Sequence, residues 1–205
     1  MSSAQAEPLP AHTLMQLEFL EALEEDWHPV SKPTRVGWLV FYGIFLVYAL
    51  TNKSGYLFID YVSLPIHEGG HLLFRWFGQT LAVLGGTILQ LGVPLALAIY
   101  FVFQRQILGT AFTAFFFFEN FLNVATYMAD SRAQALQYVT VGNAEYAEHD
   151  WAYIFIKLGV LEHDTAIGAF VRVLGWLGML GVVAWFGWKT RSRPQPPAKL
   201  PWLRH

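Results

Sequence analysis

Long apolar stretches alternate with short polar connections along most of this chain. The clearest stretches cover residues 36–50, 81–103, 107–128 and 166–188, and a further one, 56–77, is hydrophobic but interrupted by polar side chains. A transmembrane helix needs about 20 predominantly apolar residues, which most of these stretches supply, alone or with their neighbours. The pattern therefore predicts an all-α fold, a polytopic membrane helix bundle of about five transmembrane segments.

The same pattern divides the chain into three regions. Residues 1–35 are polar and acidic, and apolar residues at near-helical spacing predict an amphipathic helix lying on the membrane or on the protein. Residues 36–188 form the bundle, in which 151–161 predicts a short interfacial or re-entrant helix. Residues 189–205 are basic and contain proline, which predicts a flexible tail. The N-terminal helix and the glycine-rich last span are candidate contact surfaces for protein partners.

Composition supports a lipid environment. Hydrophobic residues make up 55% of the chain and charged residues 14%, against about 45–50% and about 25% in soluble domains. A net charge of −2 provides no general cationic field for nucleic acid. Because cysteine is absent, any metal site must use His, Asp or Glu.

Basic residues give conflicting signals about orientation. The cluster from Lys189 to Arg204 predicts a cytoplasmic C-terminus, and Lys32 with Arg35 predicts the same for the N-terminus. Five spans cannot satisfy both signals, so we give more weight to the larger C-terminal cluster. The expected location is a bacterial inner membrane, with the C-terminus in the cytoplasm.

The segment His67-Glu68-Gly69-Gly70-His71 matches the HExxH pattern. On a helix, positions i and i+4 share a face, so both imidazoles can bind one Zn²⁺. Glu68 can then reach a metal-bound water and act as general base. Ionisable groups in an apolar segment are costly and indicate function. The two glycines between the ligands suggest close approach of another backbone, from a packed helix or from a substrate strand.

A catalytic zinc usually has three protein ligands and a water. Asp130, at the end of the 107–128 stretch, is the preferred third ligand. His149 or Asp150, just before Trp151, is the next choice, although Asp150 could equally begin a helix. Glu119 comes last, because with Asn120 it could instead form interhelical hydrogen bonds or orient a ligand histidine.

A membrane helix with HExxH, a hydrophobic hairpin and a later helix carrying Asn123 and then Asp130 resembles the site-2 protease class of intramembrane zinc metalloproteases. The resemblance implies His67, His71 and Asp130 as zinc ligands, Glu68 as base, Asn123 as a substrate- or water-orienting residue, and a transmembrane peptide as substrate. Here Asp130 is followed by Ser131, and the family's proline and Asp-Gly are missing. Segment 130–165 looks more like that of small uncharacterised bacterial membrane proteins with a similar HExxH helix.

These observations predict a membrane-embedded zinc hydrolase, most simply a peptidase that uses metal-activated water. The alternative from another class is a non-catalytic, metal-stabilised membrane subunit of a larger complex. Transport of metal ions or protons through the same histidines and carboxylates is a third possibility.

Overall fold

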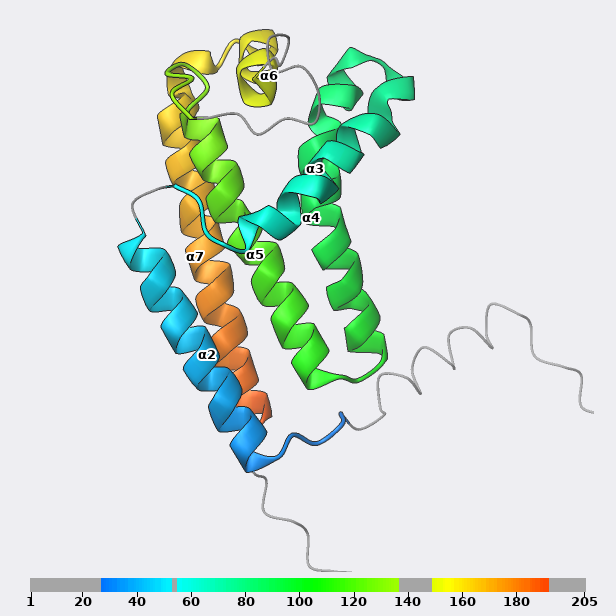
Figure 1. Cartoon of the computed structure of the whole chain (residues 1–205), viewed down its shortest axis with the longest axis vertical. Coiled ribbons are helices and arrows are strands. Elements are labelled where there is room, and N and C mark those ends of the chain that lie inside the picture. The colour runs from blue at the N-terminus through cyan, green and yellow to red at the C-terminus, as the bar shows by residue number, and fades with distance from the viewer. Residues whose placement is uncertain (1–26, 53–54, 137–148, 192–205) are drawn as a thin grey trace, which may run out of the picture.

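The computed structural model describes residues 27–52, 55–136 and 149–191, and it is a bundle of α-helices (Figure 1). The prediction of an all-α membrane bundle is confirmed. Its helices are α2 (Lys32–Thr51), α3 (Asp60–Phe74), α4 (Gln79–Phe103), α5 (Ile107–Ala129), α6 (Asp150–Leu158) and α7 (Asp164–Lys189), with short 3₁₀ turns η1 (Arg75–Phe77) and η3 (Leu161–His163). The expected N-terminal amphipathic helix and most of the tail lie outside these ranges.

Four helices of the described chain, α2, α4, α5 and α7, are long and apolar enough to cross a membrane. The remaining predicted span is α3, whose 15 residues reach only about 22 Å at 1.5 Å per residue. In Figure 1, α3 begins about half-way along α5 and runs to the upper end of the bundle. Helix α3 is therefore too short to count as a span, and the described residues contain four candidate spans instead of about five.

Helix α5 lies at the centre, packed against α7 on one side and α4 on the other. Small residues allow the closest contact. A Cβ at Gly168 would lie 2.7 Å from the carbonyl oxygen of Ala125, and one at Gly175 would lie 2.9 Å from that of Phe118. Glycines of the last span thus allow the backbones of α5 and α7 to approach closely at these positions.

Helices α3 and α4 approach each other still more closely. A Cβ at Gly85 would lie 2.5 Å from the carbonyl oxygen of Gly70, and a Cβ at Gly70 would collide with the backbone of Gly85. The sequence suggests that the HEGGH glycines allow close approach of either a packed helix or a substrate strand. For Gly70, the backbone that approaches is that of a packed helix, α4. This contact places the motif directly against the first half of α4.

The first turn of α2 and the last turn of α7 lie at the same end of the bundle (Figure 1). Arg35 Nη2 donates to the carbonyl oxygen of Gly187 at 3.3 Å, and the rings of Trp27 and Trp185 are 5.6 Å apart. With an even number of spans, the basic residues before and after the spans lie at the same end of the bundle. The two orientation signals then predict the same side of the membrane and no longer conflict.

Candidate metal centre

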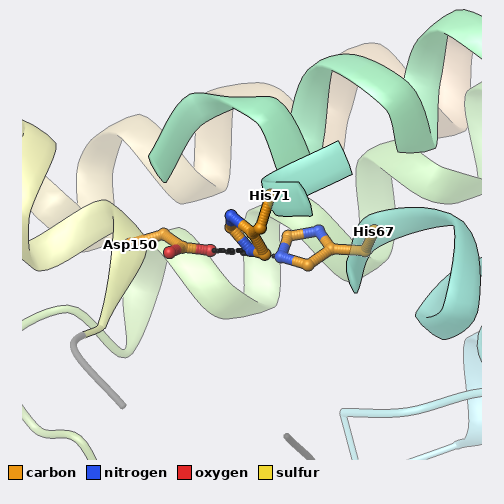
Figure 2. A group of neighbouring side chains, drawn as sticks. All are labelled: His67, His71 and Asp150. Carbon is orange, nitrogen blue, oxygen red and sulfur yellow. Dashed lines mark hydrogen bonds and ion pairs between the residues drawn. The ribbon is translucent and has the colours of Figure 1, made fainter. Parts of the chain in front are cut away.

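His67 and His71 lie one turn apart on α3, and their ring centroids are 4.7 Å apart. Both Nε2 atoms face Asp150, the first residue of α6, as Figure 2 shows. Asp150 Oδ2 is 3.1 Å from Nε2 of His67 and 3.3 Å from Nε2 of His71. One ligand atom from each residue lies within 4.8 Å of the others, so the three could hold a metal ion.

The protonation of the two rings follows from what their other nitrogens bind. His71 Nδ1 lies 2.8 Å from the carbonyl oxygen of Ala82, an acceptor only, so Nδ1 must carry a hydrogen. His67 Nδ1 lies 2.9 Å from Gln90 Oε1. The Gln90 amide nitrogen donates to Asn120 Oδ1 and Asn123 Oδ1 at 2.9 and 3.0 Å, which leaves Oε1 as the acceptor for His67.

The orientation of this network is anchored at its far end. Asn120 Nδ2 donates to the carbonyl oxygen of Phe116 at 2.8 Å, so the Asn120 oxygen is the atom that faces Gln90. Asn120 and Gln90 are 0% and 3% exposed, respectively. A chain of hydrogen bonds through α5 and α4 thus holds His67 in one tautomer, as outer partners of metal-binding histidines do.

With both Nδ1 atoms protonated, each neutral ring directs an Nε2 lone pair toward the Asp150 carboxylate. Three acceptors that converge in this way need a cation or a proton between them. A tetrahedral zinc ion with bonds of about 2.0–2.1 Å would separate its ligand atoms by roughly 3.3 Å. The distances of 3.1 and 3.3 Å to Asp150 fit that requirement.

Gly86 on α4 keeps the space beside the two rings open. A Cβ there would lie 2.5 Å from Nε2 of His67 and 2.6 Å from Nε2 of His71. Both distances are too short for a real Cβ contact, so any larger residue would push the two imidazoles out of the positions in which they face Asp150.

Electrostatics favour the charged forms of the Asp150–His71 pair. Burial raises the pKa of the Asp150 carboxyl, but its close interactions with His67 and His71 outweigh that effect and leave the pKa below its ordinary value. Burial lowers the pKa of His71, yet the hydrogen bond and charge of Asp150 raise it to about 9 overall. At neutral pH a proton on His71 therefore takes the place that a metal would otherwise occupy.

Asp130 and His149 do not join the two rings. The Asp130 carboxylate accepts backbone hydrogen bonds from Ala135 at 2.9 Å and Leu136 at 3.2 Å, and so fixes the turn after α5. His149 Nδ1 accepts from the backbone nitrogen of Ala152 at 3.2 Å and caps α6, and its Nε2 lies 3.8 Å from Asp130 Oδ2. Of the candidates for the third ligand position, Asp150 is the one that the structure brings to the two rings, in place of the preferred Asp130.

The remaining candidates occupy different places. Glu68 is partly buried on α3, near enough for its charge to raise the pKa of His71. Asn123 belongs to the network behind His67. Glu119 is fully buried and interacts with Asp60 at the start of α3, not with the rings.

Sequence reasoning missed three residues that shape the centre. Gln90 is a lone amide in an otherwise apolar stretch, and that isolation is the signal that could have identified it. Tyr127 accepts a hydrogen bond from the backbone nitrogen of Asp150 at 3.3 Å and stacks on His149 with ring centroids 4.2 Å apart. Gly86 carries no sequence signal of its own, because its role depends on how α3 packs.

Comparison of the chain with family models, curated proteins and solved structures finds no match.

Proposed function

We propose that the protein is a membrane-embedded zinc-dependent hydrolase that cleaves peptides. The observation that carries the proposal is the convergence of two imidazole Nε2 atoms on one carboxylate oxygen, at 3.1 and 3.3 Å, with all three ligand atoms within 4.8 Å of one another. Two histidines and one carboxylate are a common ligand set of catalytic zinc sites, in which the fourth position stays open. Thiolate ligands are excluded because the chain has no cysteine.

In this proposal His67, His71 and Asp150 hold the ion, and Glu68 serves as general base. Bound zinc would supply Lewis acidity and would lower the pKa of a water to near 7. Gln90 fixes His67 through the 2.9 Å bond to Nδ1, and the Ala82 carbonyl does the same for His71. The prepositioned rings need no reorganisation when the ion binds.

A peptide substrate is supported by the resemblance of HEGGH in an apolar setting to intramembrane proteases, and by the exposure of the centre. His71 has 26% of its side chain exposed, against 13% for each of His67 and Asp150. The centre is therefore most open beside His71. Beyond it α3 presents the exposed side chains of Leu72 and Leu73, an apolar surface suited to a membrane-embedded peptide.

We further propose a bacterial inner membrane location with both basic ends of the bundle in the cytoplasm. Lys32 and Arg35 begin α2, and Lys189 and Arg191 end α7. If the four candidate helices all cross, these residues would lie on one side of the membrane, and the enrichment of Lys and Arg in cytoplasmic loops would make that side the cytoplasm. The metal centre would then lie in the opposite half of the membrane.

The test combines metal analysis with hydrolysis. We expect purified protein to contain one zinc per chain and to cleave members of a mixture of synthetic transmembrane peptides, with products identified by mass spectrometry. Glu68→Gln should keep the zinc and lose at least a hundredfold in rate, because general-base catalysis contributes about 10²–10⁴-fold. Glu162→Gln, at an exposed position, is the matched control. A zinc-free wild type, or equal cleavage by Glu68→Gln, would refute the proposal.

One observation favours a second candidate, a structural metal in a non-catalytic subunit. Asp150 belongs to the nine-residue helix α6, and a bound ion would tie this short helix to α3. If Glu68→Gln had no effect while His67→Ala released α6 to proteolysis, the metal would be structural.

A further inference from the structure

At the end of the bundle opposite the metal centre, two cationic side chains lie against one tryptophan. The Arg105 guanidinium carbon is 5.6 Å from the centroid of the Trp27 ring, and Lys189 Nζ is 5.1 Å from it. Trp27 in turn packs edge-on against Trp185 of α7. We call Trp27, Arg35, Arg105 and Lys189 the basic cluster.

Arg105 has an unusual environment for a charged residue. It is only 5% exposed, and its Nε has no hydrogen-bond partner. Its backbone has a φ of 54°, and its carbonyl oxygen accepts from both the backbone nitrogen and Nδ1 of His28, at 3.0 and 3.2 Å. The turn between α4 and α5 thus fixes the Arg105 backbone, while the buried guanidinium has no anionic partner among the described residues.

The other members of the basic cluster also lack acidic partners. Arg35 donates to a backbone carbonyl through Nη2, and its Nε is a second buried donor without a partner. In the described ranges no ion pair involves Arg35, Arg105 or Lys189. The carboxylates of these ranges are on other parts of the bundle: Asp60, Glu68, Glu119, Asp130, Asp150, Glu162 and Asp164.

A buried charge without a partner is costly, so the cluster calls for an anion. Helix α5 begins at Ile107, two residues after Arg105, and its free backbone N–H groups add positive potential on the same side. Guanidinium and ammonium groups together with backbone N–H donors suit the oxygens of a phosphate.

We propose that the basic cluster binds the phosphate of an anionic phospholipid headgroup. The site lies where α2 and α5 begin and α4 and α7 end, at the level of lipid headgroups. Trp27 and Trp185 beside it are typical of that interface. The lipid phosphate would pair with Arg105 and Lys189 while its acyl chains follow the apolar outer surface of the bundle.

The experiment uses the full chain in a neutral detergent and counts bound lipid by native mass spectrometry. Phosphatidylglycerol and phosphatidylcholine with identical acyl chains are the probes. We expect one phosphatidylglycerol to bind at least tenfold more tightly than phosphatidylcholine, and Arg105→Gln to remove that difference. The matched control is Arg75→Gln, because Arg75 lies 5.5 Å over Trp76 in the same type of contact but is exposed and on a different turn.

Thermal unfolding provides a second measurement. Phosphatidylglycerol should raise the melting temperature of the wild type and of Arg75→Gln but not of Arg105→Gln. If Arg105→Gln fails to fold, Lys189→Gln replaces it. We expect Lys189→Gln to bind phosphatidylglycerol at least threefold more weakly than the wild type.

Three results would overturn the proposal. The first is equal binding of the two lipids by the wild type. The second is displacement of the lipid by millimolar inorganic phosphate, which would make a free anion the ligand. The third is neutralisation of the basic cluster by the protein's own acidic residues Glu24, Glu25 and Asp26, which precede Trp27 in the sequence. In that case, amide substitutions of these three residues would lower the melting temperature, and phosphatidylglycerol would fail to bind the wild type.

Discussion

At the level of single residues, the metal centre depends on acceptors that lie outside the HEGGH motif. Ala82 and Gln90 of α4 take the Nδ1 hydrogens of the two rings, and only then do both Nε2 lone pairs point to Asp150. The motif predicts the pair of histidines from spacing alone, because i and i+4 positions share a helix face. It cannot predict the carboxylate, since 83 residues separate His67 from Asp150.

The choice between Asp150 and Asp130 is directly testable by metal content. We expect Asp150→Ala to lose zinc, as measured by inductively coupled plasma mass spectrometry, because one of three protein ligands is removed. Asp130→Asn should retain zinc, although it should lower thermal stability because weaker acceptors would face the backbone nitrogens of Ala135 and Leu136. If Asp130→Asn lost zinc while Asp150→Ala retained it, Asp130 would again be the preferred third ligand, as the sequence predicts.

Zinc affinity should depend on pH in a defined direction. In the metal-free protein the pKa of His71 is raised to about 9, so the ring is protonated at neutral pH and zinc must displace that proton. The dissociation constant should therefore fall about tenfold per pH unit between pH 7 and 8 and level off above pH 9. Competition with a chromophoric chelator measures the dissociation constant for zinc. A dissociation constant that does not change between pH 7 and 9 would contradict the presence of a proton on His71.

The same ion pair affects stability without metal. Because the folded-state pKa of His71 lies above its ordinary 6.5, the imidazolium–Asp150 interaction stabilises the metal-free fold fully below pH 6.5. That stabilisation is lost as the pH rises through about 9. Metal-free protein should thus melt at a lower temperature at pH 9.5 than at pH 6, and zinc should reverse the difference.

At the level of helices, the glycines of α4 have two separate roles. Gly85 lets the α3 backbone approach, whereas Gly86 keeps open the space between the histidine rings. Gly86→Ala should therefore reduce zinc affinity at least tenfold through steric conflict with His67 and His71. Gly92→Ala, on the same helix with nothing within 4 Å of its added Cβ, should bind zinc like the wild type. Equal zinc binding by both variants, measured by isothermal titration calorimetry, would contradict this assignment.

Helix α3 also shows where hydropathy reasoning fails. The 56–77 stretch is apolar enough to resemble a span, yet the helix starts only at Asp60 and α-helical geometry ends at Phe74. Hydropathy measures the preference of side chains for an apolar environment, and the protein interior supplies that environment as well as lipid does. Ser63 and Gly70 of α3 are buried against the bundle, which no pattern in the stretch itself distinguishes from lipid burial. The longer helices α4, α5 and α7 were predictable because length and composition agree.

For the whole molecule, the four-span architecture makes a prediction about sidedness that also locates the metal centre. The chain contains no cysteine, so a single introduced cysteine reports its own position with a membrane-impermeant maleimide. Ser31→Cys lies just before α2 at the basic end of the bundle, and Glu162→Cys is at the other end. Ser192→Cys follows the last described residue, Arg191, in the sequence.

We expect Glu162→Cys to be labelled in spheroplasts, and Ser31→Cys and Ser192→Cys to be labelled only after the membrane is permeabilised. We expect this pattern because Lys and Arg residues near the ends of membrane spans tend to stay in the cytoplasm, and such residues lie near the start of α2 and the end of α7. Opposite labelling of Ser31→Cys and Ser192→Cys would refute an even number of spans. Inverted labelling of all three would keep the architecture but place the metal centre in the cytoplasmic half of the membrane, so that any substrate would have to reach His71 from that side.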